Sequence, residues 1–367
     1  MKTTWIFFAM VVAARSRRRV ISSGISKRRT TVFSIPQRKG VTLVEILVCL
    51  GIISLLLALL SPAIQASRER SRAISCANNF RQIGLAMHAF ESSHGQFPPV
   101  ATREIQPIAG PFQFTYPVSP HYGLLPYLDM SNLQAGISLV GDTWTHSSDP
   151  PNSSNNSARL NALSVPVFLC PSDRAIPGAT NYAMCFGTST NLHTTPDVPV
   201  PNSSRQGFGQ TGRGLRTAEV TDGLSMTVAF SERLIGAGTP SRYVPSRDIA
   251  FVFDVPFPKL PDDGVMMCEN NVTSASRHTS FSGIGWLFWT LGGTNYNQIL
   301  PPNSAIPDCQ RGTGDLGEGV FSARSLHPSG CYILLGDGAV RFVNQSIDES
   351  VWRALGTIGS SDTSEFP

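Results

Sequence analysis

The stretch Arg38-Lys39-Gly40-Val41-Thr42-Leu43-Val44-Glu45 leads directly into an apolar run over residues 46–60. From residue 41 to residue 64 the only formally charged side chain is Glu45. A helix over this segment rises about 1.5 Å per residue and reaches about 36 Å, which is enough to cross the hydrocarbon core of a bilayer with some tilt. We therefore expect a transmembrane helix over residues 41–64.

The carboxylate of Glu45 needs a partner, because an ionised group within an apolar span is costly. The nearest positive charge would be a free amino group on Val41, which a cut after Gly40 would create. We therefore interpret Lys39, Gly40 and Val41 as a processing site. The alternative is an uncleaved signal anchor in which Gly40 stands by chance.

The segment from Lys39 to Glu45 resembles the processing signal of type IV prepilins and type II secretion pseudopilins. The resemblance implies that prepilin peptidase cuts after Gly40 and methylates the new N-terminus. It also implies that Glu45 pairs with the N-terminus of a neighbouring subunit during assembly. Val41 departs from the phenylalanine that is usual at this position. This departure concerns methylation of the new N-terminus more than cleavage after Gly40.

Positive charge is concentrated in residues 1–40, which hold ten Lys or Arg and no Asp or Glu. The whole chain has 29 basic and 25 acidic residues, so 19 basic and 25 acidic residues follow this leader, a formal charge of −6. A basic block beside a spanning segment stays in the cytoplasm, so we expect a single-pass inner-membrane protein with a periplasmic or cell-surface globular domain. Nucleic-acid binding is the rival interpretation of the block, but few aromatic residues accompany it, and we assign no nucleic-acid partner. A second apolar run at residues 5–14 leaves the true start of the leader open.

Residues 65–95 predict an amphipathic continuation of the same helix. Beyond Pro62 the apolar residues recur at spacings of four and three, with charged residues between them. The apolar positions are Cys76, Phe80, Ile83, Met87 and Phe90. Gly95 and then Pro98-Pro99 should end the helix. A helix that is apolar in its first half and amphipathic in its second is typical of pilin-like subunits, and the alternative is a plain anchor with a stalk helix.

Residues 96–367 predict a β-rich exported domain, so that the fold class is α+β, with a long helix packed on a mainly antiparallel domain. Short apolar runs separated by turn residues indicate strands. These runs are 123–128, 165–170, 227–231, 249–255, 281–291 and 331–343. The last of them contains Gly336-Asp337-Gly338 between two apolar segments, which predicts a C-terminal hairpin over residues 331–343.

Six of the seven cysteines follow the apolar segment, where an exported domain meets oxidising conditions. Their spacing does not match a zinc site, and six cysteines allow fifteen pairings. We take Cys170 with Cys185 and Cys268 with Cys309 as possible disulfides. Cys49 lies within the span.

His327 and the pair Asp337-Gly338 are separated by nine residues, which resembles the C-terminal signature of a prepilin-processed family called domain of unknown function 1559. Further blocks are similar to that family along the exported part of the chain. They begin at Cys76-Ala-Asn-Asn-Phe-Arg-Gln-Ile-Gly, Gly95-Gln-Phe-Pro-Pro, Phe168-Leu-Cys-Pro-Ser-Asp, Thr180-Asn-Tyr and Thr221-Asp-Gly-Leu-Ser-Met. The resemblance implies an architecture and an export route rather than an activity.

His327 and Asp337 form the pair on which a catalytic or metal site would depend, since an imidazole and a carboxylate could converge at a hairpin end. A structural role is more ordinary, because Asp before Gly is common in turns and histidines often bond loop carbonyls.

Asp262-Asp263-Gly264 lacks the alternating ligand spacing of a calcium loop. Trp286 and Trp289 fit either a sugar-stacking platform or the core. We assign no catalytic residue, no metal and no cofactor.

The sequence therefore predicts a non-enzymatic, membrane-anchored structural subunit of a type II secretion or type IV pilus-like assembly. Its expected partners are prepilin peptidase, membrane lipid and other pilin-like subunits. The alternative from another class is a membrane-tethered cell-surface binding protein that uses the prepilin route only for export. An anchored hydrolase using His327 and Asp337 is a third hypothesis.

Overall fold

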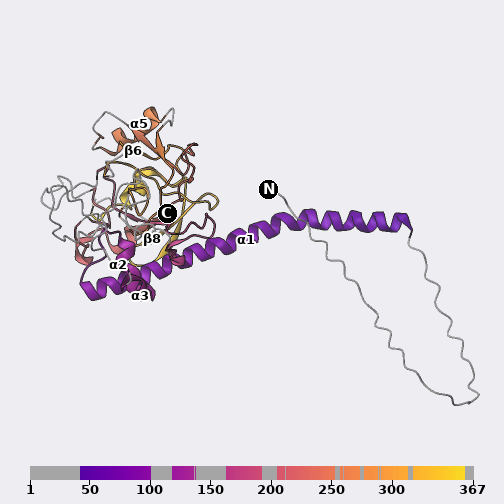
Figure 1. The fold of residues 1–367 in the computed structure, drawn as a ribbon, viewed down its shortest axis with the longest axis horizontal. Helices are drawn as coiled ribbons and strands as arrows, with labels where there is room; N and C mark the ends of the chain where they lie inside the picture. Colours follow the sequence, from indigo (N-terminus) through magenta and orange to yellow (C-terminus); the bar gives the residue numbers. More distant parts are fainter. Residues whose placement is uncertain are drawn as a thin grey trace, which may run out of the picture. The chain divides into compact units, whose positions relative to one another are not determined.

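The computed structural model describes twelve stretches of the chain (Figure 1). They are residues 42–100, 118–135, 137, 163–191, 205–210, 212–252, 257–258, 260–272, 277–287, 289, 291–312 and 317–359. The chain forms two compact units, Met1–Leu59 and Leu60–Pro367, and the second contains both β-sheets.

Helix α1 spans Leu43–His94, a length of 52 residues. Its second half buries one face, formed by Cys76, Ala77, Phe80, Ile83, Gly84, Ala86, Met87 and Phe90. This face contains all five apolar positions predicted from their spacing. The helix ends where Gly95 takes a positive φ of 70° and its N–H donates to the carbonyl of Glu91 at 2.7 Å, as expected for a glycine that follows a helix.

The larger sheet has five strands in the order β5-β1-β2-β8-β9. Their bounds are Asn295–Tyr296 (β5), Tyr182–Cys185 (β1), Val228–Glu232 (β2), Gly330–Leu335 (β8) and Val340–Asn344 (β9). All neighbours are antiparallel except β1 and β5. The pair β8 and β9 is the predicted C-terminal hairpin, and Gly338 takes a φ of 86° in its turn.

The second half of α1 packs against this sheet. The rings of Phe80 and Tyr182 meet edge to face with centroids 4.5 Å apart, and Tyr182 Oη donates to the carbonyl of Cys76 at 3.3 Å. A Cβ placed on Gly84 would lie only 3.0 Å from Leu334 of β8. The small residue therefore lets helix and hairpin approach closely, and the fold is α+β and pilin-like, as the sequence predicted.

The smaller sheet has four strands in the order β4-β3-β6-β7. Their bounds are His278–Thr279 (β4), Ile249–Val252 (β3), Cys309–Arg311 (β6) and Gly319–Val320 (β7). Helix α5, Pro261–Asn271, lies against it and carries Asp262 and Asp263 in its first turn (Figure 1). These carboxylates complement the positive end of the helix, so their place in the structure is a helix start rather than a calcium loop.

Three of the predicted strands are wrong. Residues 123–128 lie in α2, Pro120–Leu124, and the 3-10 helix η1, Leu125–Leu128, while 165–170 contain the 3-10 helix η2, Pro166–Phe168. Each begins with proline in its first two positions, where the missing N–H costs nothing. The described part of 281–291 forms turns with positive φ at Gly283 and Gly285.

Several short helices complete the described chain. They are α3 (Ser131–Ala135), η4 (Thr217–Glu219), η5 (Leu224–Met226) and α6 (Glu349–Ala354). Asp348 caps α6 by accepting hydrogen bonds from the N–H groups of Ser350 and Val351. Neither α5 nor α6 is predicted from the sequence, although a proline or an aspartate at each start is the usual signal.

Candidate functional site

Glu45 lies in the first turn of α1 and forms a hydrogen-bonded cap with Thr42. Its Oε2 accepts hydrogen bonds from the backbone N–H of Thr42 at 2.8 Å and from Thr42 Oγ1 at 3.0 Å. The backbone N–H of Glu45 donates in return to Thr42 Oγ1 at 3.3 Å. This reciprocal pattern is a capping box, and the spacing Thr-x-x-Glu before an apolar run was the signal for it that sequence analysis missed. Lys39, Gly40 and Val41 lie outside the described residues.

Among the described residues, α1 is the one helix that is long and apolar enough to cross a membrane. Its first part leaves large apolar side chains more than half exposed, for example Leu47, Leu55 and Leu59. A continuous apolar surface of this kind requires apolar surroundings. The segment therefore has the properties of a single membrane anchor.

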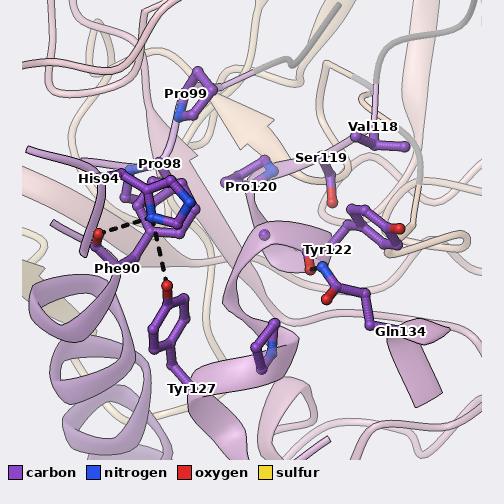
Figure 2. A pocket seen from close by; sticks show the side chains of 12 residues that line it. Phe90, His94, Pro98, Pro99, Val118, Ser119, Pro120, Tyr122, Tyr127 and Gln134 are labelled. Atoms are coloured by element: carbon purple, nitrogen blue, oxygen red, sulfur yellow. Dashed lines mark hydrogen bonds between the residues drawn. The ribbon is translucent and has the colours of Figure 1, made fainter. Parts of the chain in front are cut away.

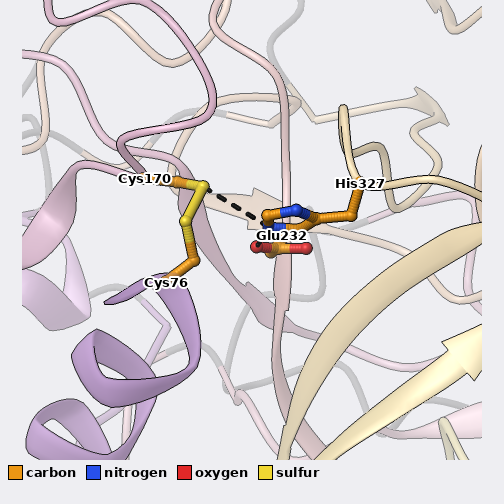
Figure 3. A group of neighbouring side chains, drawn as sticks. All are labelled: Cys76, Cys170, Glu232 and His327. Carbon is orange, nitrogen blue, oxygen red and sulfur yellow. Dashed lines mark hydrogen bonds and ion pairs between the residues drawn. A yellow bond between two sulfur atoms is a disulfide. The ribbon is translucent and has the colours of Figure 1, made fainter. Parts of the chain in front are cut away.

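A second candidate site surrounds His327, in the segment before β8 (Figure 3). The Nδ1 atom of this buried ring lies 2.9 Å from Glu69 Oε1, and the Nε2 atom lies 3.2 Å from Glu232 Oε1. Glu69 belongs to α1, and Glu232 is the last residue of β2. The backbone N–H of Tyr332 donates to the other oxygen of Glu232 at 2.9 Å. One imidazole thus joins α1, β2 and the start of the C-terminal hairpin. We refer to Glu69, Glu232 and His327 with the neighbouring disulfide as the His327 cluster.

The charges of this cluster support one another. Burial opposes protonation of His327, but the hydrogen bonds and negative charges of Glu232 and Glu69 outweigh it and raise the pKa of the ring above its ordinary value. Burial likewise opposes ionisation of Glu69, but hydrogen bonds from Arg72, His327 and Ser172 outweigh it and lower the pKa of that carboxyl. The ring therefore favours the imidazolium form, which donates from both nitrogens.

The disulfide of the cluster joins Cys76 of α1 to Cys170, and its Cys170 sulfur lies 3.7 Å from His327 Nε2. The predicted pairing of Cys170 with Cys185 is therefore wrong. Cys185 ends strand β1 as a buried free thiol beside Gln298, and burial raises its pKa to about 12. Cys76 and Cys170 are 94 residues apart, so no local pattern in the sequence pairs them.

A second disulfide joins Cys268 of α5 to Cys309 of β6, which is the pairing that the sequence suggested. It lies in a separate small core with Ala250, Val252, Ile299 and Val320. The bond ties α5 to the smaller sheet.

His327 and Asp337 do not form a pair in this structure. The six-residue strand β8 separates them, which at about 3.3 Å per residue corresponds to roughly 20 Å. Asp337 Oδ1 accepts a hydrogen bond from the N–H of Ala339 at 2.9 Å, as aspartates in turns commonly do. A Cβ on Gly338 would lie 3.4 Å from the His88 ring of α1. The two halves of the spacing signature therefore contact α1 at different places.

A cavity of about 350 Å³ lies beside the end of α1 (Figure 2). Aromatic and proline side chains form most of its lining. The rings of Phe90 and His94 stack with centroids 4.1 Å apart, and Tyr127 Oη lies 3.4 Å from His94 Nδ1. Its composition suits a small ligand with a flat or apolar face.

Trp286 is part of the core rather than a sugar-stacking platform. Its side chain is 1% exposed, and its Nε1–H donates to the carbonyl of Leu163 at 2.8 Å. Trp289 packs partly buried against the same core. The apolar run around them contributes to packing.

Signals for the partners of His327 in the sequence are weaker. Glu232 ends a strand whose other residues are all buried, and a carboxylate in that setting indicates a buried partner. Glu69 had no signal of its own, because its role depends on which turn of α1 faces the hairpin. Cys76 was expected on the buried face of the helix but not in a disulfide.

Comparisons with known proteins gave two family models that match the chain. The model described as Protein of unknown function (DUF1559) matches residues 65–350. The model described as Prokaryotic N-terminal methylation motif matches residues 35–61. The first range contains the whole His327 cluster, and the second contains Gly40 and Glu45. No curated protein and no solved structure matches the chain.

Proposed function

The chain belongs to the family described as Protein of unknown function (DUF1559), and from its prepilin-type N-terminus we propose that it is a non-enzymatic pseudopilin-like subunit. In this proposal prepilin peptidase cuts after Gly40, and the apolar part of α1 anchors the product in the inner membrane. Subunits then assemble into a type II secretion or type IV pilus-like structure. The observation that carries the proposal is the methylation motif at residues 35–61, with Glu45 at the start of an apolar helix.

Charge supports one orientation for the anchor. The ten basic residues of residues 1–40 would hold the leader in the cytoplasm, and the domain of charge −6 would lie on the far side. Membrane lipid and other pilin-like subunits are then the surroundings of the apolar helix. We propose no nucleic-acid partner.

Glu45 would link neighbouring subunits through its charge. Within the described residues, both hydrogen bonds from Thr42 go to Oε2 of Glu45, which leaves Oε1 for the amino terminus of another subunit. A charge-assisted hydrogen bond in apolar surroundings is stronger than a neutral one. Glu45 would thus cap the start of its own helix through Oε2 and bind the amino group of a neighbouring subunit through Oε1.

The experiment compares two substitutions in the capping box. Glu45→Gln keeps an oxygen that accepts from Thr42 but removes the charge, so membrane insertion should persist while incorporation into filaments falls about tenfold or more, as expected for loss of a charged hydrogen bond. Thr42→Ala weakens the cap by about 1 kcal/mol but keeps the charge, so incorporation should stay near normal. Incorporation is measured by immunoblotting sheared surface fractions against membrane fractions.

Equal loss of incorporation in both variants would contradict the proposal, because capping alone would then explain Glu45. Unchanged incorporation in Glu45→Gln would also contradict it.

The cavity beside Phe90 and His94 favours a second candidate, a membrane-tethered binding protein at the cell surface. In that case the prepilin route serves export, and the exported domain binds a carbohydrate or protein. Normal surface display of Glu45→Gln with no filament in wild-type cells would favour this candidate over the first.

A further inference from the structure

Four possible metal ligands converge in the His327 cluster (Figure 3). They are the sulfurs of Cys76 and Cys170, a carboxylate oxygen of Glu232 and a ring nitrogen of His327. All four atoms lie within 4.8 Å of one another, and all four residues are buried. In the structure the two sulfurs are joined to each other, so the set becomes a set of four ligands only when that bond is reduced.

The chemistry of these donors suits zinc. Structural zinc takes four ligands from cysteine sulfur, histidine nitrogen and carboxylate oxygen, with bond lengths of about 2.0–2.3 Å. Tetrahedral angles then place neighbouring ligand atoms about 3.3–3.8 Å apart. His327 Nε2 already lies 3.7 Å from the Cys170 sulfur and 3.2 Å from Glu232 Oε1. Only small side-chain movements would be needed once the sulfurs separate.

The surrounding hydrogen bonds also suit a metal site. Glu69 holds His327 Nδ1 at 2.9 Å, which would leave Nε2 to face the ion. A carboxylate on the far nitrogen of a ligating histidine fixes the ring and raises its basicity. The N–H of Tyr332 holds the second oxygen of Glu232, which orients the first. Each non-sulfur ligand therefore has a partner that fixes its direction.

We propose that the reduced form of the protein binds one Zn²⁺ through Cys76, Cys170, His327 and Glu232. A dithiol reductant would give two electrons and two protons to the Cys76 to Cys170 bond, which becomes two thiols, while the reductant becomes a disulfide. On binding, the ion displaces the two thiol protons and the Nε2 proton of His327 to solvent. The ion then replaces the disulfide as the link between α1, Cys170, β2 and the hairpin.

This site goes beyond the proposed function. It concerns how α1 is linked to the rest of the exported domain before the Cys76 to Cys170 disulfide forms, and not how subunits assemble. In either redox state α1 stays tied to the same three parts of the domain. Under this proposal, the absence of a metal that we expect from the sequence holds for the oxidised protein alone.

The test uses the full chain in detergent. The protein is treated with dithiothreitol, desalted without oxygen and incubated with Zn²⁺, and the bound metal is measured by elemental mass spectrometry. Thiol-reactive mass labelling after denaturation verifies which cysteines were reduced. Reduced protein should hold one zinc per chain, and oxidised protein should hold none. Co²⁺ as a substitute should give a thiolate-to-metal absorption band.

Two cysteine pairs serve as matched variants. Cys76→Ser with Cys170→Ser should abolish zinc binding, whereas Cys268→Ser with Cys309→Ser should leave one zinc per chain. Two carboxylates of α1 give a second comparison that does not disturb the disulfide. Glu69→Gln should weaken zinc affinity about 10–100-fold, as loss of a ligand's hydrogen-bond partner does. Glu91→Gln on the same helix contacts Thr217 instead and should leave the affinity unchanged.

The proposal is overturned if reduced wild-type protein retains no more zinc than the Cys76 and Cys170 double variant. It is also overturned if Glu69→Gln and Glu91→Gln bind zinc equally well. A Cys76 to Cys170 bond that resists dithiothreitol in the folded chain has the same consequence, because the site then never forms.

Discussion

Glu45 is a charge at the start of an apolar helix, and its capping box with Thr42 explains how one chain tolerates it. The cap and the proposed contact with a neighbouring amino terminus use the same carboxylate for two purposes. Only the second needs a negative charge, because glutamine also serves in a capping box. This difference is the reason for testing Glu45→Gln rather than a change to alanine.

His121 gives a pH dependence that can be measured on the isolated protein. Its ring is fully buried and makes edge-to-face contacts with Phe168 and Phe230, and its Nε2–H donates to the carbonyl of Tyr182 at 2.7 Å. Burial lowers the pKa of His121 from 6.5 to about 4, although the hydrogen bond to Tyr182 opposes this. The folded protein therefore keeps the ring neutral where the unfolded chain protonates it.

The free energy of unfolding should accordingly fall as pH falls from 6.5 to about 4, because the unfolded chain then binds a proton that the folded protein does not. The contribution of this one group reaches on the order of 3 kcal/mol. His121→Gln keeps a donor for Tyr182 and removes the titration. As the pH falls from 6.5 to about 4, the free energy of unfolding of this variant should therefore rise steadily relative to that of the wild type. Urea denaturation at several pH values measures this, and a constant difference between the two proteins would contradict the assignment.

At single positions the sequence predicted which residues have special roles better than it predicted which residues contact one another in space. It identified His327, Glu45 and the turn at Gly338, because each belongs to a local pattern. It mispaired Cys170, and it offered Asp337 as a partner for His327, because spatial neighbours depend on strand pairing. Glu69 could not be found without knowing which turn of α1 faces the hairpin.

Helix α1 is the element that the sequence predicted most fully. Its apolar period and its Gly95 stop both follow from local physics, so the buried face and the helix end were predictable. For the short helices η1 and η2 the sequence predicts strands, because a run of four to six apolar residues has too few positions to separate the helical period from the strand period. Prolines at their starts were the stronger signal.

Phe80 tests the packing of α1 on the sheet. Its ring is fully buried against Tyr182, so Phe80→Ala should lower the free energy of unfolding of the exported domain by about 3–5 kcal/mol. Leu85 lies on the same helix and is 73% exposed, so Leu85→Ala should change it by less than about 0.5 kcal/mol. Urea denaturation followed by tryptophan fluorescence compares them, since Trp286 and Trp352 are in the core. Similar small losses in both variants would show that this face of α1 does not pack on the sheet.

Within Leu60–Pro367 the two sheets have separate cores that a buried ion-pair network connects. Asp308, just before β6, accepts hydrogen bonds from Arg233, just after β2, at 2.8 Å and from Arg324 at 2.9 Å. Burial opposes ionisation of Asp308, but the two guanidinium groups outweigh it and lower its pKa. The sequence holds no local pattern for this network, since Asp308 is 75 residues from Arg233 and 16 residues from Arg324.

For the whole molecule, the proposed function depends on where the mature chain begins. The basic leader, the methylation motif and the apolar helix that follows all lead to a cut after Gly40. A cut there removes every basic residue of the leader and creates the amino group that Glu45 is proposed to bind. Without this cut, the protein would be a membrane-anchored domain that lacks the amino group needed for assembly into a filament.

N-terminal sequencing of the protein extracted from membranes, together with its intact mass, tests this most directly. We predict a mature chain that begins at Val41 and carries one added methyl group on its amino terminus. A chain that retains residues 1–40, or one that begins at any other residue, would contradict it.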